Sequence, residues 1–322
     1  MNPGEQTIKW LYHEQLKIND EWAIRTPNGF KWWADKNAQT IELIGEETGP
    51  NGEIGYLISI RTDFLCNLEL TDHSLAAINA LLMVFAAMAG PVYEPEKRTL
   101  ELCSLVRVHQ GISTWMNSLL SVAAVMQIAE ARIMANEVAR VLGAQEAVSG
   151  HPEHGIRQDP DQMVGVVAGL IVPMGKEPCK WSAKDFQDVV DQYMQGPPSL
   201  GAGADGPGCV AEFPCGERSS LCLMRADQPH PRYGNGLFLL QSFPVGEMSD
   251  AEGAKLALSL NRDELTVKPS GYGFGSFVYR DGSVHFTSFL PNATYGTGLL
   301  PNIYFANANR AREMAIRLKK RD

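Results

Sequence analysis

Four residues in the C-terminal half, Cys209, Cys215, Cys222 and His230, are of the types that bind zinc. Zinc ligands usually come in pairs about two to four residues apart, so that one turn of the chain presents both to the ion. No two of these four residues have that spacing, and three of them fall in or beside expected strands. We therefore interpret the cysteines as small apolar core residues and expect no bound metal.

Two other segments suggest ligand chemistry without the context it needs. Residues 151–154 read His-Pro-Glu-His, but the proline interrupts any helix that would bring both imidazoles to one face, so we expect a solvated loop. Residues 201–206 match the glycine pattern of dinucleotide-binding proteins, which requires a strand before it and a helix after it. Here an expected helix precedes the glycines and a Pro-Gly pair follows them, so we expect a flexible loop and no cofactor.

The sequence contains none of the motifs that would place a catalytic group. It has no Gly-x-Ser-x-Gly elbow, no glycine-lysine phosphate loop and no His-Glu-x-x-His pair. We therefore expect no catalytic residues and a protein that is not an enzyme. The alternative is an enzyme, or a regulator that binds a small ligand, whose site lies in a cleft between two halves of the chain.

Tryptophans crowd the start of the chain, at Trp10, Trp22, Trp32 and Trp33. Neighbouring residues of a strand point to opposite faces, so a single layer of helices covers only one of the last two indoles. Either both are buried in core, or one of them faces the other half, a groove or a partner. Because tryptophan is enriched at binding hot spots, the candidate partner-binding residues are Phe30, Trp32 and Trp33.

The expected elements occur in the same order in both halves. The first half gives a helix at 7–17, strands at 22–26, 30–34 and 55–64, a helix at 72–88, strands at 92–94 and 100–108, and a helix at 114–142. The second gives a helix at 182–194, strands at 210–213, 219–225 and 236–243, a helix at 250–265, strands at 274–279 and 284–290, and a helix at 299–319. Residues 27–29 and 214–216 both read Pro-x-Gly, which is typical of a type I turn. Ser249 and Glu252 form an expected capping box, and Asp281-Gly282 an expected hairpin turn.

This repetition predicts an α+β fold of two tandem α-β-β-β-α-β-β-α modules related by a pseudo-twofold axis. The modules are residues 1–148 and 179–322. Residues 149–178 are expected to be a linker, because this glycine- and proline-rich segment is too short to bury a core of its own.

Composition limits the partners and the compartment. The chain has 322 residues, 44% of them hydrophobic, and a net charge of −9, which argues against disorder, nucleic acid and anionic membrane surfaces. No apolar run reaches the roughly 18–20 residues of a membrane span, and six cysteines do not make a disulfide scaffold, so the cytoplasm is the expected location. A basic cluster at the end of the last helix is interpreted as complementing the helix dipole, with a patch for phosphate or an acidic partner as the alternative; its residues are Arg310, Arg312, Arg317, Lys319, Lys320 and Arg321.

The element order resembles that of the class I type III secretion chaperones and of the YbjN-type bacterial proteins. The stretch Leu258-Ser259-Leu260-Asn261, followed by the hairpin Tyr279-Arg280-Asp281-Gly282-Ser283-Val284, is similar to the YbjN pattern of a helix that ends in asparagine before a charged glycine turn. The resemblance implies a non-catalytic, chaperone-like or regulatory protein of bacterial type that binds a protein or an extended peptide segment. Two modules in one chain would then form an intramolecular pseudo-dimer, present as a monomer or a weak homodimer.

Overall fold

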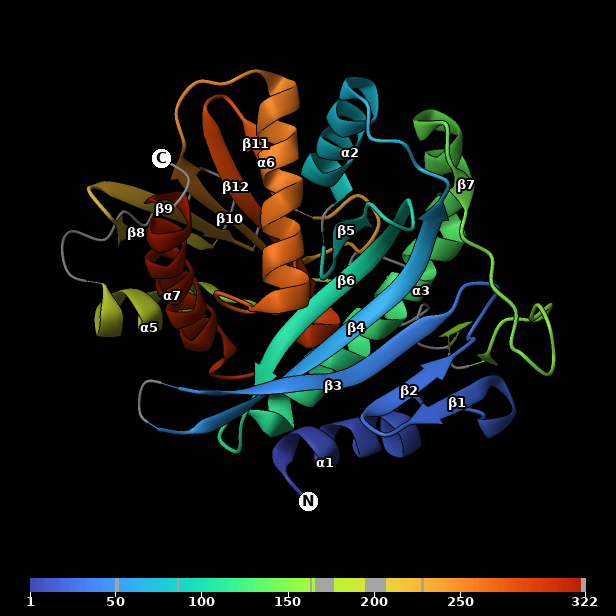
Figure 1. Ribbon diagram of the computed structural model, residues 1–322. Helices are drawn as coiled ribbons and strands as arrows, with labels where there is room; N and C mark the ends of the chain where they lie inside the picture. Colours follow the sequence, from blue (N-terminus) through green and yellow to red (C-terminus); the bar gives the residue numbers. More distant parts are fainter. Residues whose placement is uncertain are drawn as a thin grey trace.

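The computed structural model describes residues 1–49, 52–85, 87–162, 164–165, 177–194, 207–226 and 229–319. Within these residues the fold is a mixture of helices and two antiparallel sheets, which confirms the expected α+β class. Figure 1 shows the two sheets as neighbouring parts of the fold.

The first sheet comes from the N-terminal half and has the strand order β1-β2-β3-β4-β6-β5. Its strands are β1 (Ala23–Thr26), β2 (Gly29–Trp32), β3 (Gln39–Thr48), β4 (Ile54–Cys66), β5 (Gly90–Glu94) and β6 (Thr99–Val108), and the short β7 (Gln145–Glu146) pairs with the end of β4. The helices of this half are α1 (Pro3–Trp10), α2 (Asp72–Phe85) and α3 (Ser113–Leu142).

The second sheet comes from the C-terminal half and has the strand order β11-β12-β10-β9-β8. Its strands are β8 (Gly208–Cys215), β9 (Arg218–Arg225), β10 (Gly236–Pro244), β11 (Ser276–Arg280) and β12 (Ser283–Pro291). Its helices are α5 (Ala183–Tyr193), α6 (Asp250–Arg262) and α7 (Leu299–Lys319). The expected capping box at α6 is present, since Ser249 accepts a hydrogen bond from the Glu252 amide while the Glu252 carboxylate accepts one from the Ser249 amide.

Without β1, the order of the first sheet is β2-β3-β4-β6-β5. The second sheet, read from its other edge, has the corresponding order β8-β9-β10-β12-β11. This is the order that a duplication predicts, although the duplication and its twofold axis remain an interpretation. In this correspondence the two Pro-x-Gly turns are not equivalent, because Pro27 lies between β1 and β2, whereas Cys215 ends β8, the strand that corresponds to β2. Strand β3 is not among the expected elements, because Gln39 is buried in place of an apolar residue and an irregularity between Leu43 and Gly45 interrupts the alternation.

Helix α3 is shared by both halves. Its C-terminal part packs against β4, β6 and β7, while Trp115 near its start contacts the Tyr272 ring of the second half at a centroid distance of 5.6 Å. Met116 and Leu119 belong to the same continuous core as Phe289. The sequence analysis found no apolar run of membrane-spanning length, yet α3 contains an 18-residue window with a mean hydropathy of 1.4, of which 67% is buried within the protein. Burial in a shared core accounts for this apolar character.

The first part of the predicted linker belongs to the structure of the first half. The amide of Ser149 donates to the Lys36 carbonyl at 3.0 Å, and the amide of Asp161 donates to the Ala34 carbonyl at 2.7 Å. Residues 166–176 lie outside the described part of the chain. The division into modules at 148 and 179 remains a prediction, but a single core runs across it.

A buried carboxylate anchors the segment that joins α6 to β11. Glu264 is fully buried and lies 3.5 Å from the Arg310 guanidinium and 3.2 Å from that of Arg317. It also accepts hydrogen bonds from the amide and the hydroxyl of Ser270. Arg310 and Arg317 therefore neutralise a buried charge, a role that the helix-dipole interpretation of these arginines did not include.

The anchored segment then crosses to the first sheet. Gly273 and Leu105 of β6 exchange backbone hydrogen bonds, and a Cβ at position 273 would lie 2.2 Å from the Leu105 carbonyl oxygen. Only glycine allows so close an approach of the two backbones. The halves are thus joined by hydrogen bonds as well as by apolar contacts.

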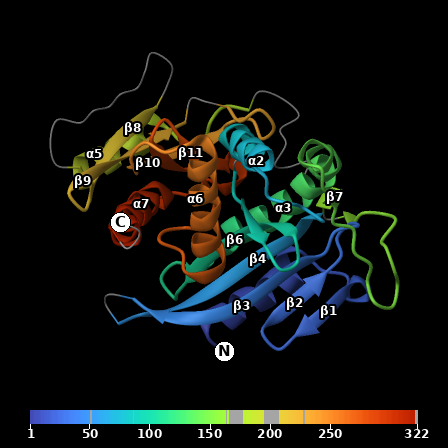
Figure 2. The ribbon, with the colours of Figure 1, turned by 45° about the horizontal axis from the view of Figure 1, so that its top comes forward.

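Two asparagines cover the outer edge of β11. Asn261 of α6 donates to the carbonyl of Phe277 and accepts from its amide, and Asn79 of α2 does the same with Tyr279. In both views α2 and α6 stand side by side next to this edge (Figures 1 and 2). These side chains supply the hydrogen bonds that a further strand would otherwise make, so this edge is closed to strand addition.

Replacing Asn79 with alanine should lower the free energy of unfolding by about 1–3 kcal/mol, because the amide and carbonyl of Tyr279 lose their partner. Urea denaturation measures the change. The control is Asn136→Ala, the same substitution at an exposed position of α3, which should leave stability unchanged or slightly raised. Equal stability of the two variants would show that the edge contact does not stabilise the fold.

Arg310→Met should lower the free energy of unfolding by about 3–5 kcal/mol, because it leaves the Glu264 carboxylate buried with one partner fewer. Glu313→Gln, which removes a partner of the exposed Arg312, should change it by less than about 1 kcal/mol. Similar melting curves for both variants would contradict the anchoring role of Glu264.

Candidate functional site

All three candidate partner-binding residues are buried. Phe30 and Trp32 are each 1% exposed and belong to the main core. The Tyr12 ring packs edge-on against Phe30, and the Trp32 indole donates to the Gln39 side chain at 3.0 Å. Neither side chain is accessible to a partner in this structure.

Trp33 follows the last residue of β2 and contacts other partners than Trp32 does, but it too is only 3% exposed. Its indole donates to the Ser149 hydroxyl at 3.2 Å, and the His151 ring packs edge-on against it at 4.9 Å. Both indoles are thus buried, which is the first of the two alternatives, and the segment interpreted as a linker covers the face of Trp33. Strand periodicity carries no information about such a distant segment.

The His-Pro-Glu-His segment is likewise not a solvated loop throughout. His151 is buried, His154 is exposed, and the amide and carbonyl of His151 pair with those of Gly155. The same turn occurs at His230, whose backbone pairs with that of Gly234. The sequence signal for this pair of turns is the pattern His-Pro-x-His/Tyr-Gly, which occurs at 151–155 and 230–234.

The four candidate zinc ligands do not form a site. In the part of the chain that the structure describes, no three His, Cys, Asp or Glu side chains are grouped to hold a metal ion. Cys209 and Cys222 are fully buried in the core, where burial raises the pKa of each thiol to about 12. These thiols therefore stay protonated and lack the thiolate character of a ligand or a nucleophile. The glycine run at 201–206 lies outside the described residues.

Ser242 and His285 form the serine–histidine contact that an acyl-transfer site would need. They are directly opposed on β10 and β12, and the hydroxyl lies 2.8 Å from Nδ1. Nε2 of His285 lies 3.4 Å from the carbonyl oxygen of Arg280, where a catalytic triad would place a carboxylate. The pair lines neither of the two cavities described below.

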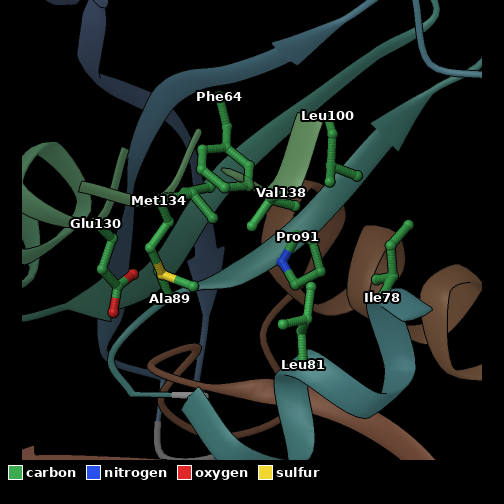
Figure 3. Close-up of a pocket in the computed structure, with 10 residues that line it drawn as sticks. Phe64, Ile78, Leu81, Ala89, Pro91, Leu100, Glu130, Met134 and Val138 are labelled. Atoms are coloured by element: carbon green, nitrogen blue, oxygen red, sulfur yellow. The ribbon is translucent and has the colours of Figure 1, made fainter. Parts of the chain in front are cut away.

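An apolar pocket lies between α2, α3 and the first sheet (Figure 3). Its volume is about 70 Å³. Nine of its lining residues are apolar: Phe64, Ile78, Leu81, Ala89, Pro91, Leu100, Leu102, Met134 and Val138. The tenth is Glu130, whose carboxyl group lies beside Met134 at one end of the pocket (Figure 3). Glu130 is not among the site residues expected from the sequence, because a single glutamate in a long helix gives no signal of burial.

Glu130 connects this pocket to the second half. Its Oε1 accepts a hydrogen bond of 2.7 Å from the hydroxyl of Tyr233, which belongs to the turn at 230–234. Burial raises the pKa of Glu130 to about 7, while the Tyr233 hydrogen bond and the charge of Arg232 oppose that rise. Within the described residues Oε2 has no hydrogen-bond partner. The pocket thus combines apolar walls with one acid that titrates near neutral pH.

A larger cleft of about 690 Å³ lies between the halves. It is bounded by the ends of β3 and β6, by the anchored segment at 268–272 and by α7. Cationic side chains from three of these elements line it, namely Arg107, Lys268 and Arg312, together with the rings of Tyr272 and Phe305. Arg107 pairs with Glu53 and Arg312 with Glu313, whereas Lys268 forms no ion pair with any described carboxylate. The cleft is where the sequence analysis placed the alternative site for a small ligand.

Comparison of the chain with protein-family models, curated proteins and solved structures finds no match. The resemblance to YbjN-type proteins and secretion chaperones therefore remains a prediction, and function has to be inferred from the geometry of the two cavities.

Proposed function

We propose that the protein is a non-catalytic binding protein that receives one side chain of an extended partner segment in the pocket between α2, α3 and the first sheet. The observation that carries the proposal is a pocket whose described lining consists of nine apolar residues and a single polar one. Apolar walls bind by excluding water, and one polar group gives the ligand its orientation.

The size of the pocket favours a side chain over a whole ligand. Sites for small molecules and cofactors usually measure roughly 300–1,000 Å³. A cavity of about 70 Å³ is far below that range and comparable with a few methylene groups. A partner that inserts one side chain would make its remaining contacts on the surrounding surface.

The chemistry of the described residues supports a non-catalytic role. The raised pKa values of Cys209 and Cys222 leave these thiols unreactive. The Ser242–His285 pair lacks a carboxylate on the far side of the imidazole. Among the described residues that line the pocket, Glu130 alone is ionisable, so these residues offer no nucleophile–base pair.

Met134→Trp should weaken peptide binding at least about tenfold, because the larger side chain fills the pocket. Linear peptides selected from a displayed random library against the native protein provide the ligands, and calorimetry measures their affinities. The matched control is Ile133→Trp, the neighbouring residue on α3, which is 67% exposed and should leave affinity unchanged. Failure to select any peptide, or equal binding by Met134→Trp, would contradict the proposal.

The cleft between the halves supports a second function, the binding of a small ligand. Its volume of about 690 Å³ lies within the usual range for small-molecule sites, and Lys268 offers a cation that no described carboxylate neutralises. The rings of Tyr272 and Phe305 could pack against a planar group. This function uses residues distinct from those of the apolar pocket, so the two are tested separately.

A double variant, Lys268→Ala with Phe305→Ala, should abolish binding of small anionic fragments found by ligand-observed NMR. Both side chains are exposed, so their loss should not affect folding. Met134→Trp, which alters only the apolar pocket, serves as the control and should retain the bound fragments. If no fragment binds the native protein, or the double variant binds equally, the cleft is not a ligand site.

A further inference from the structure

Glu130 differs from the other residues of the apolar pocket in what it requires of a ligand. One carboxyl oxygen is satisfied by Tyr233, and the other has no hydrogen-bond partner among the residues that the structure describes. Oε2 is not among the fully enclosed side-chain atoms that lack a partner, so it is open to solvent at the pocket, and a ligand that donates a hydrogen bond offsets the cost of displacing that solvent. An occupant made only of hydrocarbon would enclose the group and increase the cost.

The shape and charge of the site favour a particular donor. The unbranched methylene chain of lysine matches a small apolar pocket, and its ammonium is a compact charge that a single carboxylate can neutralise. An arginine would bring a planar group with five donors to a site that offers one unpartnered acceptor. The net charge of −9 also attracts basic partner segments.

Resting on the function proposed above, we propose that the side chain received by the pocket is a lysine, whose methylene stem packs among Phe64, Met134 and Val138 and whose ammonium binds Glu130. Figure 3 shows the Glu130 carboxyl group beside Met134, so that stem and ammonium would have adjoining partners. This assigns to the pocket a cationic partner residue and to Glu130 the role of selecting it.

The charged groups near Glu130 give the proposal a definite pH dependence. Tyr233 donates to it, Arg232 lies close by on the same turn, and the other described residues that line the pocket carry no charge. Burial raises the pKa of Glu130 to about 7, so the acid is mostly neutral below that pH. An ammonium binds the ionised form, so its affinity should rise with pH and be about 100-fold weaker at pH 5 than at pH 8.

The test compares three probes with the same alkyl chain: n-butylamine, butan-1-ol and butyrate. Binding is followed by the methyl NMR signal of Met134, assigned with a Met134→Leu variant. We expect the amine to bind more tightly than the alcohol, and the alcohol more tightly than the carboxylate. Glu130→Gln should remove the preference for the amine and its pH dependence, whereas Glu137→Gln, an exposed position on the same helix, should change neither.

The outcomes separate this proposal from the function on which it rests. If none of the probes shifts the Met134 signal, the pocket binds no side chain and the proposed function fails. If the alcohol binds as tightly as the amine, the pocket still receives a side chain, but the proposed selection of lysine by Glu130 is overturned. Persistence of the pH dependence in Glu130→Gln would assign it to another group, such as His230 stacked on Tyr233, and would also overturn the proposal.

Discussion

Burial of α3 by both halves is the constraint on which the rest of the structure depends. The helix packs on the first sheet, yet its start touches Tyr272 and joins the core around Phe289. A helix so apolar cannot be left half in water, because each exposed methylene would cost roughly 0.8 kcal/mol. The two halves therefore fold against one another, and the wall of the apolar pocket is set by the same helix.

Polar groups then fix how the halves meet. Glu264, held by Arg310 and Arg317, directs the segment that pairs Gly273 with Leu105. Separating such a buried ion pair costs far more free energy than the pair contributes to stability. This contact therefore defines a single arrangement of the two halves. Asn79 reaches from the first half to the edge of β11, and Tyr233 reaches from the second half to Glu130. The interface consists of specific hydrogen bonds placed around a shared apolar core.

The contact between Glu130 and Tyr233 places the candidate site at this interface. The apolar walls belong to the first half, but the group that orients Glu130 belongs to the second. A ligand that pairs with Glu130 would change the charge of a group in direct contact with Tyr233. Binding in the pocket would thus change the contact between the two halves, although the ligand itself would not contact the second sheet.

The sequence by itself determined the helices, most of the strands and their order, because periodicity, capping residues and turn residues act over a few neighbouring positions. It predicted the capping box at Ser249 and the long helix that became α3. Only the tertiary structure decided the burial of Trp33, the ion pairing of Arg310 and the position of Glu130. Each depends on a partner more than forty residues away, Ser149, Glu264 and Tyr233 respectively, and no local pattern encodes such a partner.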